Sequence, residues 1–183
     1  MQEWTPDAAG RAVPGQTAGH PSGQTDCGDF GIRIDRDGVW SYCGSPISRM
    51  PLVKLFASAL RRDEGGTYWL ATPAERGRIT VEDAPFLAVG LVATGQGRAQ
   101  VLTFRTNLDD SVSLGPDHPL RVTTDGTGAP RPYILVRDRL EARLTRAVFY
   151  ELVEFGCEDQ VAGGGCFGLW SNGTFFAIGE LDP

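Results

Sequence analysis

The sequence predicts an α+β fold, and three features of the chain lead to this prediction. Short apolar segments bounded by turn residues, which are typical of strands, occupy most of its second half. Two other segments, at residues 49–62 and 146–155, repeat apolar residues at helical spacing. The segments around both helices follow the same order. We therefore predict an internal duplication of a β-β-α-β unit, with strands predominating in the second half.

The first unit opens with a β-hairpin over residues 32–42, in which Asp37-Gly38 forms the tight turn. Ser48 is then placed to cap a helix that starts at Arg49, because a serine hydroxyl can accept hydrogen bonds from the free amides of a first helical turn. A strand over residues 67–72 completes the unit.

The second unit repeats this order near the end of the chain. Residues 133–144 form its hairpin, Thr145 caps a helix that starts at Arg146, and residues 167–178 form a further hairpin. Between the two units we expect five more strands, at residues 79–82, 86–94, 99–106, 112–114 and 120–123.

The same patterns divide the chain into three parts. Residues 1–25 are rich in turn-forming residues and lack a hydrophobic period, so we expect an irregular N-terminal arm that Trp4 can anchor. An N-terminal α+β domain follows over residues 26–78, and a C-terminal α+β domain covers residues 79–183.

The composition excludes several classes of function. The chain has 183 residues, of which 41% are apolar, so it can bury a core. Lys and Arg number 17 against 23 Asp and Glu, and the net charge of −6 disfavours binding to a nucleic-acid polymer or an anionic membrane. No apolar run approaches the roughly 20 residues of a transmembrane helix, and the N-terminus lacks the regions of a secretory signal. We therefore expect a cytoplasmic protein.

No metal or cofactor site is expected from the sequence. The 4 cysteines show no C-x-x-C spacing and the chain has 2 histidines, so the paired ligands of a zinc site are missing. We interpret the cysteines as reduced thiols. Because no nucleophile–base or phosphate-loop motif occurs, we assign no catalytic residue.

Two arginines at helix starts point to an anion. Arg49 and Arg146 are each expected as the first residue of a helix, where a cation opposes the helix dipole at a cost of roughly 0.3–1 kcal/mol. An anionic ligand shared between each arginine and the free helical amides would compensate for this cost. The alternative is an internal ion pair with Asp35, Asp37 or Asp138.

Four polar residues complete the candidate site. Glu82 and Asp83 follow a strand and can accept hydrogen bonds from a ribose or a base. Arg105 and Asn107, at the end of another strand, can donate. If the two domains face each other, these residues and the helix-start arginines would line one cleft between them, because pockets are common at domain interfaces.

Six stretches of the chain are long and specific enough to compare with known families: Cys27-Gly28-Asp29, Asp37-Gly38-Val39-Trp40, residues 44–49 (GSPISR), 51–56 (PLVKLF), 81–86 (VEDAPF) and 102–107 (LTFRTN). Over residues 26–178 the chain resembles the bacterial family called domain of unknown function 1285. This resemblance implies a duplicated α+β core whose C-terminal part is superficially similar to pleckstrin-homology domains. It also implies a nucleotide-like ligand at the domain interface and a role in signal transduction.

We therefore predict a non-catalytic module that binds a small anionic, nucleotide-like ligand. One alternative is a hydrolase or transferase that uses Glu82 and Asp83 as acid and base. The other is a protein–protein adaptor without a ligand, which exposed apolar patches without a polar cleft would favour.

Overall fold

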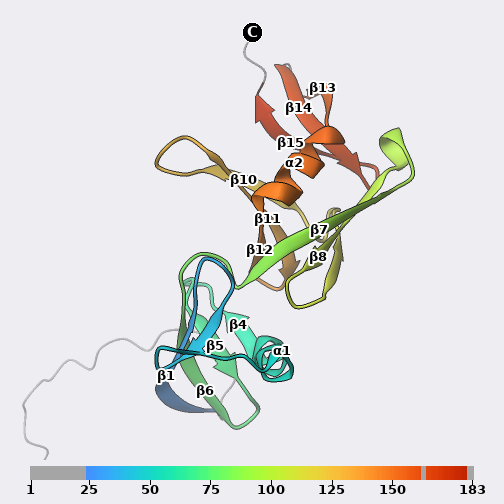
Figure 1. The fold of residues 1–183 in the computed structure, drawn as a ribbon. Coiled ribbons are helices and arrows are strands. Elements are labelled where there is room, and N and C mark those ends of the chain that lie inside the picture. Colours follow the sequence, from blue (N-terminus) through green and yellow to red (C-terminus); the bar gives the residue numbers. More distant parts are fainter. Residues whose placement is uncertain (1–23, 162–163, 181–183) are drawn as a thin grey trace, which may run out of the picture.

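The computed structural model describes residues 24–161 and 164–180, which form an N-terminal half and a C-terminal half stacked end to end (Figure 1). The strand-rich architecture with two α-helices among the described residues confirms an α+β fold. Most of the expected N-terminal arm, including Trp4, lies outside the described residues. No helix in the described ranges is both long and apolar enough to cross a membrane.

The N-terminal half is built on one six-stranded sheet with the order β3-β2-β1-β6-β5-β4. Strands β1 and β6 run parallel at its centre, and all other neighbours are antiparallel. Helix α1 connects β3 to β4 and turns its buried residues Val53 and Ala57 inward. The bounds are β1 (Thr25–Ile34), β2 (Trp40–Tyr42), β3 (Ser45–Pro46), α1 (Met50–Ala59), β4 (Leu60–Arg62), β5 (Tyr68–Ala71) and β6 (Glu75–Val81).

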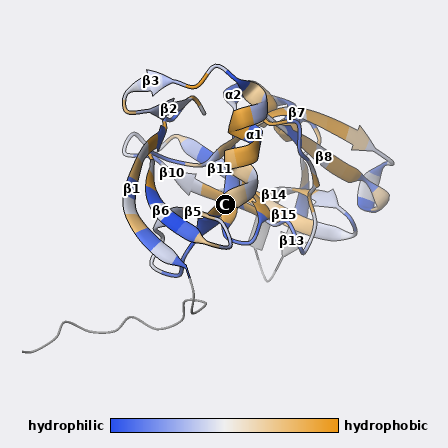
Figure 2. Cartoon of the chain, turned by 90° about the horizontal axis from the view of Figure 1, so that it is seen from below, coloured by the Kyte–Doolittle hydropathy of each residue, from blue (hydrophilic) through white to orange (hydrophobic). Residues whose placement is uncertain are grey.

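The C-terminal half contains a second six-stranded sheet, with the order β10-β11-β12-β7-β8-β9. Here β7 and β12 run parallel at the centre. Hydrophobic residues are concentrated on β7 and β8 (Figure 2), which contribute the fully buried Phe86 and Phe104 to the core. The bounds are β7 (Phe86–Thr94), β8 (Val101–Thr106), β9 (Ser111–Ser113), β10 (Leu120–Thr124), β11 (Pro130–Arg137) and β12 (Leu140–Leu144), and a 3-10 turn at Gly97–Ala99 lies between β7 and β8.

A helix and a small sheet end the chain. Helix α2 (Arg146–Glu154) follows β12, and β13 (Cys157–Val161), β14 (Gly164–Ser171) and β15 (Thr174–Glu180) form a three-stranded antiparallel sheet. The buried Ser171 joins this sheet to the rest of the C-terminal half. Its Oγ accepts from the Leu102 amide (3.0 Å) and donates to the Leu114 carbonyl (2.7 Å).

The two six-stranded sheets share one connection pattern. In each, two antiparallel three-stranded meanders are joined by a parallel pair between the first and the last strand, so β1–β6 correspond in order to β7–β12. In this correspondence α1 lies inside the first sheet's sequence, whereas α2 follows the second sheet. The correspondence of β1–β6 with β7–β12 therefore differs from the duplicated β-β-α-β unit that the sequence predicts. That duplication stays a prediction.

The helix starts correct one part of the sequence interpretation. Helix α1 begins at Met50, and Arg49 is its N-cap with no side-chain capping bond, so Ser48 is not the cap. Arg146 is the first residue of α2, as expected, and the Thr145 side chain accepts from the Val148 amide. The two arginines therefore do not occupy equivalent helical positions.

Several boundaries also differ from the expected ones. The segment expected as one helix to residue 62 ends at Ala59, and β4 follows it directly. Strand β6 continues to Val81, so the first sheet extends past the expected domain boundary at residue 78. Strands β3, β4 and β13 were not predicted.

Candidate functional site

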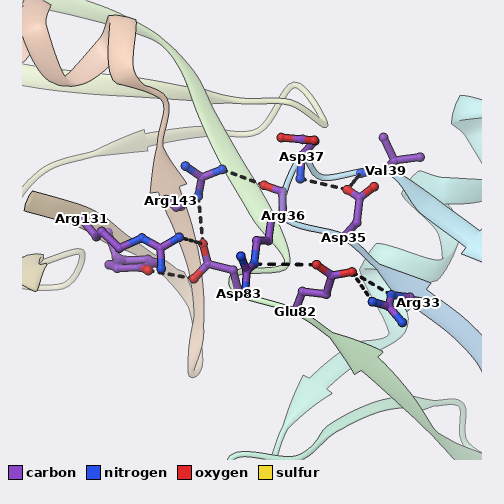
Figure 3. Close-up of polar contacts among 10 residues, drawn as sticks. Arg33, Asp35, Arg36, Asp37, Val39, Glu82, Asp83, Arg131 and Arg143 are labelled. Atoms are coloured by element: carbon purple, nitrogen blue, oxygen red, sulfur yellow. Dashed lines mark hydrogen bonds and ion pairs between the residues drawn. The ribbon is translucent and has the colours of Figure 1, made fainter. Parts of the chain in front are cut away.

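Glu82 and Asp83 lie in the link between β6 and β7, where the two halves of the protein meet (Figure 3). Their side chains point to different halves. Glu82 lies beside two arginines of the N-terminal half: Arg33 donates from Nε (2.8 Å), and Arg36 Nε is 3.8 Å from Oε2. Both ion pairs of Glu82 are therefore formed within the N-terminal half, with residues of β1 and of the turn that follows it.

Asp83 instead contacts three residues of the C-terminal half. The Tyr133 hydroxyl donates to Oδ1 (2.8 Å), and Arg131 donates from Nη2 to Oδ2 (3.4 Å). Arg143 Nε lies 2.9 Å from the same Oδ2 as an ion pair without hydrogen-bond alignment. The Asp83 side chain is 11% exposed. Burial and the negative charge of Asp83 both raise the pKa of Tyr133, so its hydroxyl stays a donor.

The arginines at the helix starts are both exposed, and they lie at the ends of different helices. Within the described ranges neither guanidinium makes a hydrogen bond or an ion pair. The ion pairs that we considered with Asp35, Asp37 or Asp138 are therefore not formed. Asp35, for example, accepts from the amides of Asp37 and Val39 (2.9 Å each).

Arg105 and Asn107 belong to a polar cluster at the turn between β8 and β9. Arg105 Nη1 lies 3.7 Å from Asp109, whose carboxylate also accepts from Lys54 (2.7 Å). The hydrogen bond from Lys54 lowers the pKa of Asp109. Asn107 is used structurally, because its Oδ1 accepts from the Leu87 amide (3.0 Å).

The structure therefore brings the six predicted residues together only in part. Glu82 and Asp83 form one cluster, Arg105 and Asn107 belong to a second, and the two helix-start arginines stand apart. Among the described residues, no hydrogen bond or ion pair connects these groups.

A polar hollow of about 360 Å³ does lie between the two halves, but none of the predicted residues lines it. Arg139 pairs there with Glu64 (3.0 Å), and Arg62 stacks over Tyr68 at 5.2 Å. Four carboxylates face two guanidinium groups, so the hollow carries net negative charge. The full lining is Arg62, Asp63, Glu64, Gly66, Leu135, Asp138, Arg139 and Glu141.

A larger cavity lies elsewhere, within the N-terminal half. This N-terminal groove has a volume of about 610 Å³ and is bordered by strands β1, β2, β3 and β5 and by helix α1. Its lining consists of Phe30, Ile32, Tyr42, Ser45, Pro46, Ile47, Leu52, Phe56, Ala59, Leu70 and Thr72. Apart from the hydroxyl groups of Tyr42, Ser45 and Thr72, these side chains are apolar, and none carries a charge near neutral pH.

The groove walls are fixed by close packing. Phe56 stacks against the buried Trp40, with ring centroids 6.5 Å apart. Phe30 fits only because position 77 is glycine: a Cβ built there would lie 2.6 Å from the Phe30 ring. Sequence reasoning missed the groove because alternating apolar residues on β1 and the helical spacing of Leu52 and Phe56 are equally typical of an ordinary core.

The described residues contain no group of three His, Cys, Asp or Glu side chains that could hold a metal ion. All four cysteines lie in described segments and are free thiols.

Comparisons with known proteins agree with this fold. Family models match residues 20–84, as the N-terminal domain of the domain of unknown function DUF1285, and residues 85–178, as the C-terminal domain of the protein of unknown function DUF1285. A search of curated proteins found no match.

Two solved structures resemble the chain over most of its length. A DUF1285 family protein from Silicibacter pomeroyi DSS-3 has 45% identity and a TM-score of 0.79, with 86% of this chain and 84% of that chain covered. One from Shewanella baltica OS155 has 28% identity and a TM-score of 0.55, with 68% and 91% covered. The two family models together span both halves of the fold, and the chain therefore belongs to the DUF1285 family.

Proposed function

We propose that this protein is a non-catalytic binding module whose ligand site is the N-terminal groove. The observation that carries the proposal is the lining of the groove, which is apolar except for hydroxyl groups. Its volume of about 610 Å³ lies in the range of roughly 300–1,000 Å³ that is usual for small-molecule sites. The lining has hydroxyl groups but no carboxylate, imidazole, thiol or amine that could activate a hydroxyl as a nucleophile, which supports a binding role.

The lining also defines the class of ligand. Moving a charged group into a site without counter-charges is strongly unfavourable, so the ligand is an uncharged molecule with an apolar or aromatic body. The hydroxyl groups of Tyr42 and Ser45 can each form a hydrogen bond with a polar group on such a molecule. The Thr72 hydroxyl already donates to the Glu75 carbonyl (3.1 Å) and accepts from the Glu75 amide (3.0 Å). A phosphate-bearing ligand has no cationic partner among the lining residues.

This proposal can be tested with the neutral fluorescent probe N-phenyl-1-naphthylamine and two variants of α1. Leu52 lines the groove, whereas Leu55 lies on the same helix, is 63% exposed and does not line it. We expect the wild-type chain to bind the probe, Leu52→Glu to weaken binding at least tenfold, and Leu55→Glu to leave binding unchanged. Equal effects of both variants, or no binding by the wild type, would contradict the proposal.

A second candidate is the nucleotide-like anion at the junction of the two halves, with the signalling role that the family resemblance implies. The polar hollow supports it, because Arg62 makes no ion pair among the described residues and borders that hollow. The surrounding carboxylates oppose it. A thermal-shift screen of mono- and dinucleotides separates the two candidates: a shift that is absent in Arg62→Ala and present in Leu52→Glu favours the junction. A ligand at a hundred times its dissociation constant stabilises a fold by about 2.7 kcal/mol, which such a screen detects.

A further inference from the structure

We infer that the ligand of the N-terminal groove carries an uncharged carbonyl group, and that the indole Nε1 of Trp40 donates a hydrogen bond to its oxygen. This inference rests on the proposed function of the groove and narrows the class of ligand. It follows from the position of Trp40 against the groove lining and from the unsatisfied donor on its side chain.

Trp40 lies on the face of the sheet that borders the groove. It pairs with Ile34 between β1 and β2, and Tyr42 pairs with Ile32 in the same ladder. Tyr42 and Ile32 both line the groove. Side chains two residues apart on a strand point to the same face of a sheet, so the Trp40 side chain extends this wall of the groove toward the interior.

Two further contacts hold Trp40 against the lining. The Ile47 amide donates to the Trp40 carbonyl (2.8 Å), and the Phe56 ring is stacked on the indole with an angle of 23° between the two planes. Ile47 and Phe56 are themselves lining residues. The indole is therefore separated from the cavity by the Phe56 ring and not by a further layer of the core.

The indole N–H of Trp40 has no hydrogen-bond partner among the described residues, although its nitrogen is buried. The whole residue is only 2% exposed. Buried donors in folded proteins are nearly always paired, because an unpaired donor has lost its water without any replacement. The indole of Trp69 follows this rule, since it donates to Asp63 (2.9 Å). A ligand that supplies an acceptor would satisfy the Trp40 donor.

The chemistry of the donor selects the group on the ligand. An indole N–H can only donate, whereas the hydroxyl groups of Tyr42 and Ser45 can donate or accept. A hydroxyl group on the ligand would bring a proton that needs a further acceptor, and a carboxylate would bring a charge into a groove without cations. A neutral carbonyl oxygen accepts the indole proton and adds neither demand.

The Phe56 ring has to move before a ligand reaches the indole. Phe56 is half-buried at the groove wall, and its ring borders a cavity of about 610 Å³ that has room for a different rotamer. When the ring turns away, a flat apolar ligand can take its place against the indole and bring its carbonyl oxygen to Nε1. The hydrogen bond then offsets the lost stacking of Phe56 on Trp40.

The experiment uses two neutral fluorescent probes that differ only in the carbonyl group. The propionyl probe is 6-propionyl-2-(dimethylamino)naphthalene, and the propyl probe is 6-propyl-2-(dimethylamino)naphthalene. For each chain we measure the ratio of the dissociation constant of the propyl probe to that of the propionyl probe. This ratio isolates the carbonyl group, because a change in the shape of the groove affects both probes.

Trp40→Phe removes the donor, and Tyr42→Phe and Ser45→Ala are the controls that remove the two hydroxyl groups. We expect the ratio to fall by about fivefold in Trp40→Phe, as the loss of one neutral hydrogen bond predicts, and to stay at the wild-type value in both controls. A ratio that is unchanged in Trp40→Phe, or that falls equally in either control, overturns the inference.

A second readout keeps Trp40 in place and does not depend on the folding of Trp40→Phe. The chain has 4 tryptophans, so Trp4→Phe, Trp69→Phe and Trp170→Phe identify three indole N–H signals in an NMR spectrum and leave the fourth to Trp40. We expect the propionyl probe to move the Trp40 signal further downfield than the propyl probe does, because a hydrogen bond to oxygen deshields the proton. Equal shifts with the two probes overturn the inference.

The two probes separate the failure of the inference from the failure of the proposed function. If the wild type binds the propyl probe and Leu52→Glu does not, the groove is a ligand site whatever the carbonyl group contributes. An unchanged ratio then overturns only the role of Trp40. If the wild type binds neither probe, the ligand site and the carbonyl preference are both overturned.

Discussion

Arg143 contacts both Asp83 and the backbone of the N-terminal half. Its Nε lies 2.9 Å from Asp83 Oδ2, and its Nη2 donates to the Arg36 carbonyl (2.7 Å) in the turn between β1 and β2. One guanidinium on β12 thus connects the interdomain link to the turn of the first hairpin. Other contacts between the two halves include the ion pairs of Arg139 with Glu64 and of Lys54 with Asp109.

Replacing Asp83 with asparagine should destabilise the protein strongly. The amide would leave the mostly buried guanidinium groups of Arg131 and Arg143 without their counter-charge. Breaking a buried ion pair from one side costs roughly 3–5 kcal/mol, and the partial exposure of the arginines reduces the expectation to about 2–4 kcal/mol. Urea unfolding followed by tryptophan fluorescence measures the loss.

Asp109→Asn is the matched control for this variant. Asp109 also pairs with two cations, Lys54 and Arg105, but its side chain is 63% exposed. Exposed ion pairs contribute little, so we expect its unfolding midpoint to stay close to that of the wild type. Equal losses from the two substitutions would contradict the expectation that the burial of the ion pairs of Asp83 decides the cost.

Stability should fall at alkaline pH through Tyr133. Burial raises its pKa above the ordinary value of 10.0, and the hydrogen bond to Asp83 raises it further. The folded protein therefore holds this proton more tightly than the unfolded chain, so the stabilisation is complete below about pH 10 and is lost as the pH rises through the raised pKa. Tyr133→Phe should remove the most alkaline part of the tyrosinate absorbance titration and flatten the decline of stability above pH 10.

Tyr68 is the internal reference for that titration, since burial raises its pKa as well. A late tyrosinate step should therefore remain in Tyr133→Phe with a smaller amplitude. Loss of absorbance change near pH 10, and not at the alkaline end of the curve, would mean that Tyr133 ionises like a free tyrosine.

At the acid end, Asp63 should contribute to stability in the opposite sense. The hydrogen bond from the Trp69 indole (2.9 Å), together with those from nearby backbone amides, lowers the pKa of Asp63 below 3.8. Its stabilisation is therefore present above about pH 4 and is lost as the pH falls through the lowered pKa. Asp63→Asn should be less stable than the wild type at pH 7 and should depend less on pH between about pH 4 and pH 2.

Trp69 provides a direct readout of this interaction. Its fluorescence, isolated as the difference from Trp69→Phe, should titrate with Asp63 and lose that titration in Asp63→Asn. A midpoint above 3.8 would contradict the predicted direction of the pKa.

The sequence predicts best those elements whose local structure is decided by a few neighbouring residues. Thr145 was expected to cap a helix and does so. Residues 167–178 were expected to form a hairpin, and Asn172 and Gly173 have the positive φ angles that its turn requires. Leu60 shows where such signals fail. Its apolar side chain suits the helix periodicity, but it pairs with Leu70 in a strand, a choice that depends on a distant partner.

The candidate site could be predicted less well, for a related reason. The chain bends at Glu82 and Asp83 after β6 ends, and the two adjacent side chains reach arginines of different halves. Those arginines are far away in the sequence, and no local pattern assigns them. The groove could not be predicted because residues that line a cavity and residues that fill a core have the same hydrophobic periodicity.

The last prediction concerns Gly77, which determines the space available to Phe30. A Cβ at this buried position on β6 would lie 2.6 Å from the Phe30 ring, too close for either group to remain in place. Phe30 lines the N-terminal groove, so Gly77→Ala should move its ring and change the cavity. Overpacking of this kind typically costs about 1–3 kcal/mol.

Two measurements check this prediction, because the same displacement should act on stability and on binding. We expect Gly77→Ala to unfold at lower urea concentration and to bind the neutral probe more weakly than the wild type. Gly126→Ala is the control, since a Cβ there meets nothing within 4 Å. In the double variant Phe30→Leu/Gly77→Ala the smaller, flexible side chain relieves the clash, so part of the lost stability should return. The prediction is contradicted if Gly77→Ala is as stable as Gly126→Ala and binds the probe normally. Phe30 would then be able to leave the groove wall without loss of stability, and its packing against Gly77 would not determine the shape of the groove.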